Sequence, residues 1–276
     1  MKRKLWFFTL ILLFILSGCK DDYQAFYNKE LAASLKEEFP ETIMLLGASF
    51  ANKDNGWFEI TCSQLGIRGI NKAIGGEAIY HTARRMAAGK QYTLKELDEI
   101  DLLVLMHVHN QNVISSPNLK ENYLDYGDFE NNYNYAEAFD YVIKKYKADC
   151  AALEFNPESK YYGKKNGKPA KIILCTHWHD SRTLYNSTVR QLAEKWDIPL
   201  VEFDTNIGFS MDDAGNKDPG EPSRKVSKDT EIIDGVEYGW HPKGGAKEYI
   251  QKKISSIFLE KLLSEYNFEG ELTEDI

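Results

Sequence analysis

The run Ile-Met-Leu-Leu-Gly-Ala-Ser, residues 43–49, decides the fold of this chain. Four apolar residues in a row, ended by a glycine, are typical of a strand that is buried on both faces. Similar runs lie at 67–74, 102–106, 171–175 and 200–203, and segments with helical spacing lie at 57–65, 77–88, 135–147, 184–196 and 245–266. Short apolar strands that alternate with helices predict a three-layer α/β/α fold with a mostly parallel five-stranded sheet.

The composition agrees with a globular domain and disfavours one class of partner. The chain has 276 residues, of which 43% are hydrophobic, and its 34 Lys and Arg against 42 Asp and Glu give a net charge of -8. A protein that binds the phosphate backbone needs a basic surface. We therefore expect no nucleic-acid partner.

The first nineteen residues predict export and a lipid anchor. Basic residues at 2–4 precede an apolar run at 5–16, which is too short to span a bilayer and is typical of a signal peptide. The ending Leu16-Ser17-Gly18-Cys19 resembles a bacterial lipobox, in which Cys19 is acylated, and Lys20-Asp21-Asp22 resembles a surface-export signal of Gram-negative lipoproteins. We expect a lipoprotein in the bacterial cell envelope, at the outer membrane, bound to the membrane through Cys19.

These features divide the chain into four segments. We expect a signal peptide at 1–18, the lipidated cysteine and a tether at 19–40, one α/β domain at 41–266 and an acidic tail at 267–276. Within the domain, Cys62, Cys150 and Cys175 have neither an even count nor paired spacing. Free buried thiols are therefore expected, with neither a disulfide framework nor a cysteine-based zinc site.

Polar residues gather where the predicted strands end. Ser49 follows the first strand, Gly75-Gly76 the second, and His241-Pro242 precedes the last helix; the other strand ends carry His107, His109, His177 and His179. Sites in open α/β sheets form beyond the carboxyl ends of the strands. Two polar stretches, 111–134 and 206–240, are too long for simple connections and are expected to shape this site.

In these blocks and their order, residues 42–263 resemble the SGNH (GDSL-type) hydrolase superfamily. Leu45-Leu46-Gly47-Ala48-Ser49 stands where the family has its nucleophile, Ala73-Ile74-Gly75-Gly76 matches the second block, and His241-Pro242 matches the terminal block. The resemblance implies a flavodoxin-like sheet and a serine ester hydrolase of the carbohydrate esterase or deacetylase type, with no cofactor. Its substrate would be an ester-bearing small molecule or glycan, cleaved through an acyl-serine intermediate.

The same resemblance assigns roles to single residues. Ser49 would be the nucleophile and His241 the general base, while the backbone N–H groups of Ser49 and Gly76 would form the oxyanion hole. His109 stands where the family has an asparagine that donates to the oxyanion, and Asn110 is a substitute shifted by one residue.

Several positions depart from the family pattern. Ala48 replaces an aspartate, His107 replaces a glycine, and Tyr238 stands where an aspartate is expected three residues before the catalytic histidine. Glu237, Asp234 or a backbone carbonyl could orient His241 instead, the last leaving a Ser-His dyad.

Two other functions fit parts of the sequence. Residues two apart on a strand share a face, so His107, His109, His177 and His179 could bind zinc in a metal-dependent hydrolase. Alternatively, the lost motif residues could mark a catalytically inactive surface lipoprotein that binds glycans.

Overall fold

The computed structural model describes residues 39–53, 56–107, 134–209 and 218–266. Its centre is a sheet of five strands in the order β2-β1-β3-β4-β5, and every neighbouring pair is parallel. The strands are β1 (Thr42–Gly47), β2 (Arg68–Asn71), β3 (Leu102–Met106), β4 (Ile172–Cys175) and β5 (Leu200–Val201). The predicted fold class is thereby confirmed.

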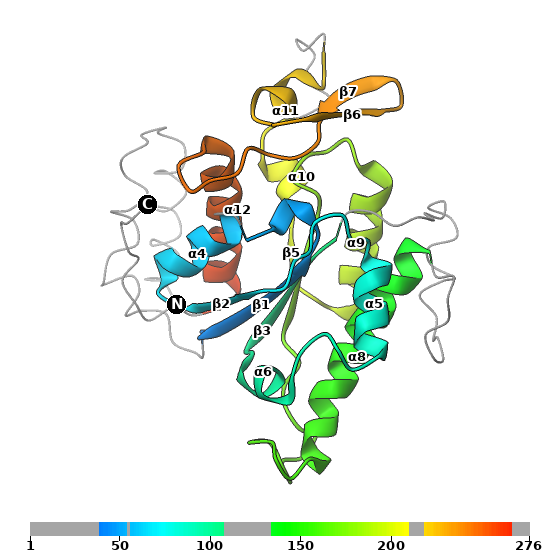
Figure 1. Ribbon diagram of the computed structural model, residues 1–276, viewed down its shortest axis with the longest axis vertical. Helices are drawn as coiled ribbons and strands as arrows, with labels where there is room; N and C mark the ends of the chain where they lie inside the picture. The colour runs from blue at the N-terminus through cyan, green and yellow to red at the C-terminus, as the bar shows by residue number, and fades with distance from the viewer. Residues whose placement is uncertain (1–38, 54–55, 108–133, 210–217, 267–276) are drawn as a thin grey trace, which may run out of the picture.

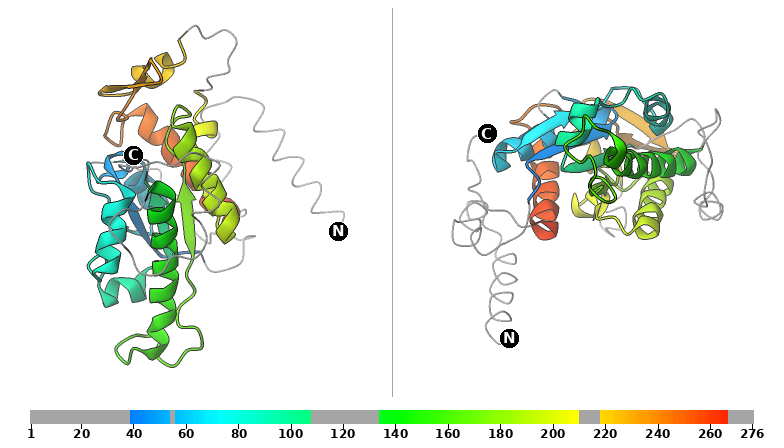
Figure 2. Two further views of the ribbon diagram at one scale, coloured as in Figure 1. Left: turned by 90° about the vertical axis from the view of Figure 1, so that its right-hand side faces the viewer. Right: turned by 90° about the horizontal axis from the view of Figure 1, so that it is seen from below.

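Helices cover both faces of this sheet (Figures 1 and 2). One layer contains α4 (Trp57–Leu65) and α12 (Tyr249–Glu265), beside the short α10 (Phe203–Asn206). The other contains α5 (Ile79–Ala87), α8 (Tyr135–Ala152) and α9 (Thr183–Trp196), with α6 (Leu94–Glu99) and the 3-10 turn η3 (Leu153–Phe155) at its margin. The layers are those expected for strands that are apolar on both faces.

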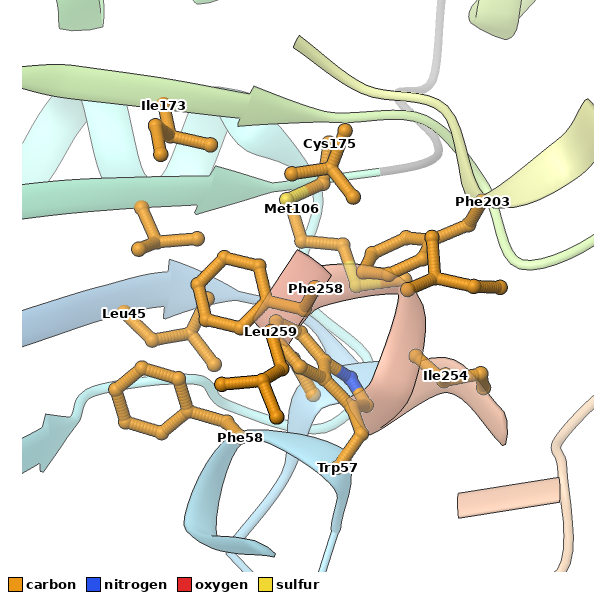
Figure 3. Packing of buried hydrophobic residues seen from close by; sticks show 14 of the residues in the cluster. Leu45, Trp57, Phe58, Met106, Ile173, Cys175, Phe203, Ile254, Phe258 and Leu259 are labelled. Atoms are coloured by element: carbon orange, nitrogen blue, oxygen red, sulfur yellow. The ribbon is translucent and has the colours of Figure 1, made fainter. Parts of the chain in front are cut away.

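Successive residues of β1 point to opposite cores. Ile43 and Leu45 pack with α4 and α12, whereas Met44 and Leu46 pack with α5, α8 and α9. Figure 3 shows the first core, in which the ring of Trp57 lies edge-on to Phe258 with the centroids 4.9 Å apart. Both cores hold the carboxyl end of β1 in place, and this end carries Ser49.

A second unit projects beyond the sheet at its carboxyl edge (Figure 1). It consists of α11 (Glu221–Lys225) and the antiparallel strands β6 (Thr230–Ile233) and β7 (Val236–Gly239). The two strands form a sheet of their own and are not hydrogen-bonded to the central one. The Asp-Gly dipeptide at 234–235 indicates such a turn, but α11 and α6 were not predicted.

Some of the predicted strands and helices differ from the observed ones at their ends. The second strand is shorter than the predicted 67–74 and the last helix begins at Tyr249 rather than near 245, whereas the predicted helix at 57–65 and strand at 102–106 are confirmed. Cys62, Cys150 and Cys175 are free and buried, as expected. Cys19, the predicted tether up to residue 38, the predicted loop 111–134 up to residue 133 and the acidic tail lie outside the described residues.

None of the helices in the described part of the chain is long and apolar enough to cross a bilayer.

Gly47 ends β1 at a place where the backbone comes close to its neighbours. A Cβ atom there would lie 2.8 Å from the carbonyl oxygen of Met106 and 3.1 Å from Cβ of Ala51. We expect Gly47→Ala to lower the free energy of unfolding by about 1–3 kcal/mol, because the backbone of β1 or β3 must shift.

Urea denaturation of the purified domain measures this change. Gly75→Ala is the matched control, because its Cβ would meet only Asn52 Nδ2 at 3.8 Å. Equal stability of the two variants would contradict the close packing at the end of β1.

Candidate active site

Ser49 lies directly beyond the carboxyl end of β1, as predicted. It begins the 3-10 turn η1 (Ser49–Ala51), which Phe50 and Ala51 anchor by burying their side chains. Ser49 itself is half-buried, and its backbone N–H donates to no described residue. The turn therefore presents a hydroxyl and an unused N–H at the same rim of the sheet.

His241 meets this serine from the far end of the chain. Its Nε2 lies 2.8 Å from Ser49 Oγ, although the two residues are 192 positions apart. The Phe50 ring stacks on the imidazole, with centroids 5.3 Å apart and an interplanar angle of 23°. The structure thus brings together the two residues that the sequence analysis paired as nucleophile and base.

A third residue, Asp229, completes the hydrogen-bonded chain. Asp229 Oδ2 lies 2.7 Å from His241 Nδ1, and Oδ1 accepts the backbone N–H of His241 at 2.7 Å. Because a carboxylate only accepts hydrogen bonds, the imidazole proton resides on Nδ1. Nε2 then carries the lone pair that accepts the Ser49 hydroxyl proton.

Asp229 was missed, and the three predicted ways of orienting His241 are wrong. Glu237 Oε1 accepts a hydrogen bond from Thr230 Oγ1 at 2.8 Å, and Asp234 lies in the hairpin turn. The imidazole contacts a carboxylate rather than a backbone carbonyl. The site therefore contains a Ser-His-Asp arrangement in place of the Ser-His dyad considered above.

The hairpin register explains why Asp229 reaches His241. Asp234 and Gly235 have φ values of 50° and 83°, as a two-residue type I′ turn requires. The pairing they set continues past β6 and β7, because Trp240 N donates to Asp229 O at 2.9 Å and Lys228 N donates to His241 O at 3.0 Å. Counting outward from the Asp-Gly turn is the sequence signal that could have found this residue.

The surroundings keep Asp229 ionised. Partial burial alone would raise the pKa of its carboxyl group, but hydrogen bonds from the backbone and ring of His241 outweigh burial and hold the pKa below its usual value. A charged carboxylate at this place stabilises a protonated imidazole.

The second predicted block lies beside the serine turn. Asn71 joins the two, because its Nδ2 donates to Ala51 O at 2.7 Å and its Oδ1 accepts the N–H of Ala73 at 2.9 Å. Gly76 is exposed at a φ of 77°, and no described residue accepts its backbone N–H. His109 and Asn110, predicted near the oxyanion, lie outside the described residues.

The other histidines at the strand ends are buried and engaged by the protein. His107 Nε2 lies 3.0 Å from Thr82 Oγ1, and His177 Nδ1 lies 3.2 Å from the carbonyl oxygen of His179. His179 Nε2 donates to Gly239 O at 2.9 Å, so its Nδ1 accepts from Ser181 Oγ at 2.7 Å.

This geometry weakens the zinc hypothesis. His179 has no lone pair left for a metal, since the one on Nδ1 accepts the Ser181 hydroxyl. Among the described residues, no group of three or more His, Cys, Asp or Glu side chains could hold a metal ion.

One family model matches most of the chain. Residues 40–264 match a family model described as Domain of unknown function (DUF5040), so the chain belongs to this family. A comparison with curated proteins finds no match.

Several solved structures are similar in fold. One, from Veillonella parvula, belongs to the lipolytic protein G-D-S-L family (13% identity, 79% of this chain and 96% of that chain, TM-score 0.41). Another is the lipase/acylhydrolase from Enterococcus faecalis (10% identity, 86% of this chain and 99% of that chain, TM-score 0.43). A third is the C-terminal catalytic domain of peptidoglycan O-acetyltransferase A from Streptococcus pneumoniae (15% identity, 82% of this chain and 95% of that chain, TM-score 0.41).

The burial of His179 predicts how stability depends on pH. Burial lowers the pKa of its imidazole to about 3, so the folded state keeps it neutral while the unfolded state binds a proton below its pKa of 6.5. The stability that the neutral form contributes is therefore present above pH 6.5 and is lost as the pH falls toward 3, by about 1.4 kcal/mol per pH unit.

We expect His179→Gln to flatten the plot of unfolding free energy against pH between 6 and 4. Glu231 contributes with the opposite sign, because burial raises the pKa of its carboxyl group to about 7. The contribution of Glu231 cancels when the unfolding free energy of the variant is subtracted from that of the parent protein at each pH. Identical slopes of the two plots would show that the pKa of His179 is the same in the folded and unfolded states.

Proposed function

We propose that this member of the DUF5040 family is a serine ester hydrolase with Ser49 as nucleophile, His241 as general base and Asp229 as the acid that orients the base. The observation that carries the proposal is the unbroken chain of hydrogen bonds from Ser49 Oγ through the imidazole to the Asp229 carboxylate. A serine hydroxyl needs a base within hydrogen-bond reach to attack an ester.

The reaction follows from the positions of the protons. As Ser49 Oγ attacks the ester carbonyl, its proton moves to His241 Nε2, and Asp229 stabilises the resulting imidazolium. The tetrahedral intermediate collapses when the C–O bond to the alcohol breaks and His241 returns the proton to the departing oxygen. Water, deprotonated by the same imidazole, then attacks the acyl-serine and releases the acid.

The negative charge on the oxygen of the tetrahedral intermediate needs hydrogen-bond donors to stabilise it. The N–H groups of Ser49 and Gly76 are available among the described residues, and Asn71 ties the two loops that carry them. One such donor contributes about 2.7–4 kcal/mol to the transition state. His109 is proposed as a third donor on the strength of its place in the sequence.

The substrate class rests on the predicted location of the protein. A lipid on Cys19 would hold the domain in the cell envelope, where acylated glycans are abundant esters. We propose an ester-bearing glycan or small molecule as the substrate, with no cofactor. The complete Ser-His-Asp arrangement disfavours the inactive glycan-binding alternative, because a site that is no longer used need not keep this geometry.

Removing the nucleophile should abolish the activity. Ser49→Ala leaves no group to form the acyl-enzyme, so we expect hydrolysis of p-nitrophenyl acetate to fall by about 10⁴-fold or more. Labelling by a fluorophosphonate, followed by mass spectrometry of the modified peptide, should locate the adduct on Ser49. An adduct on another serine, or full activity in the variant, would refute the assignment.

Asp229→Asn tests the residue that the sequence analysis missed. An amide cannot hold the imidazole in the required tautomer or stabilise its cation, so kcat should fall by about 10²–10⁴-fold while KM changes little.

The two acids predicted instead of Asp229 supply matched controls. Asp234→Asn keeps a residue that tolerates a positive φ, and Glu237→Gln keeps the side-chain length. Both variants should retain activity within about threefold, and a loss in either that equals the loss in Asp229→Asn would argue for a different acid.

A further inference from the structure

The segment between β4 and α9 contains His177-Trp178-His179, and the proposed reaction uses none of these residues. Asn186, which is buried on α9, fixes this segment because its Oδ1 accepts the N–H of His177 at 2.8 Å and its Nδ2 donates to His179 O at 3.3 Å. Residues 177–182, here called the β4–α9 turn, are thus a rigid part of the α/β domain.

This turn contacts both strands of the hairpin that supplies Asp229. Trp178 Nε1 donates to Trp240 O at 3.2 Å, and His179 Nε2 donates to Gly239 O at 2.9 Å. On the other strand, Arg182 forms an ion pair with Glu231, two residues after Asp229. Each side chain of this pair is only 16% exposed.

The guanidinium also packs against the neighbour of the proposed base. Arg182 Cζ lies 4.4 Å from the ring centroid of Trp240, and Trp240 in turn meets Phe50 edge-on with the centroids 4.8 Å apart. Phe50 follows Ser49 and stacks on His241. A continuous set of packed groups therefore joins Arg182 to all three residues of the proposed site.

The hairpin needs such an attachment. Its two strands are not hydrogen-bonded to the central sheet, while Ser49 belongs to that sheet's rim. The 2.8 Å contact between His241 Nε2 and Ser49 Oγ joins parts of the molecule attached to different sheets, so the hairpin must be held within a fraction of an ångström.

We propose that Arg182 and Glu231 are positioning residues for this site: their ion pair, packed against Trp240, fixes the hairpin on the β4–α9 turn so that Asp229 and His241 stay aligned with Ser49. This inference rests on the proposed function for its kinetic consequences. The alignment itself is a property of the folded protein and can be measured without a substrate.

Arg182→Met removes the guanidinium and keeps much of the side-chain volume. We expect kcat for p-nitrophenyl acetate to fall by about 10–100-fold with little change in KM, because a small displacement of the proposed acid and base slows proton transfer. Arg182→Lys should recover part of the loss. Lys145→Met breaks an ion pair of α8 that is distant from the hairpin and should leave kcat unchanged.

A double-mutant cycle with His241 separates a positioning role from a purely structural one. If Arg182 acts by aligning the hairpin with Ser49, then Arg182→Met added to His241→Ala should lower kcat by less than about threefold. Losses that multiply in full would overturn the proposal.

Arg182→Met leaves a buried carboxyl group without its partner and can fail to fold. The double variant Arg182→Met/Glu231→Met removes both charges, and such replacements of buried pairs are often neutral for stability. It should melt close to the parent protein and still show the loss in kcat. Full activity in this folded variant would overturn the proposal.

The Nδ1 proton of His241 gives a readout that is independent of turnover. Its hydrogen bond to Asp229 should give a downfield proton resonance that is absent in Asp229→Asn, weakened in Arg182→Met and intact in Lys145→Met. An intact resonance in Arg182→Met together with an unchanged kcat would refute the positioning role. A resonance that behaves as expected in a protein without esterase activity would instead refute only the proposed function.

Discussion

The contact between Ser49 Oγ and His241 Nε2 is the constraint on which the arrangement of the molecule depends. It spans 2.8 Å in space and 192 positions in sequence. The serine side is held by β1, whose residues are buried in two cores at once, and by the turn that Phe50 and Ala51 anchor. The histidine side is held by a hairpin outside the central sheet, so two independently built parts must meet at one atom pair.

The two parts solve this problem in different ways. The sheet uses apolar burial, which is strong but fixes only the place where a strand ends. The hairpin uses directed contacts instead: hydrogen bonds from Trp178 and His179 to backbone carbonyls, and the charged contact between Arg182 and Glu231. Directional contacts at a polar rim can set angles as well as distances. The histidine-rich segment that resembles a metal site is therefore occupied by structural hydrogen bonds.

The sequence predicts the sheet well because burial leaves a direct pattern. Leu102–Met106 and Trp57–Leu65 are confirmed at their stated bounds, and Ser49 and His241 meet as the block order predicts. Asp229 was not predicted because its role depends on the pairing of two strands across a turn. The spacing of residues along a single strand does not reveal that pairing. The short helices α6 and α11 were not predicted, because a helix of five or six residues shows too little hydrophobic periodicity to be distinguished from a loop.

The two-residue turn at Asp234 and Gly235 has a consequence for how this protein can vary. The two-residue turn sets the pairing of Asp229 with Trp240 and of Lys228 with His241, so a change in its length that shifted this register would move Asp229 relative to the imidazole. The tip is exposed and does not contact the hydroxyl, yet its length is under the same constraint as the reacting groups. Exposed loop tips usually tolerate changes in length, whereas the length of this one sets the position of a proposed catalytic residue.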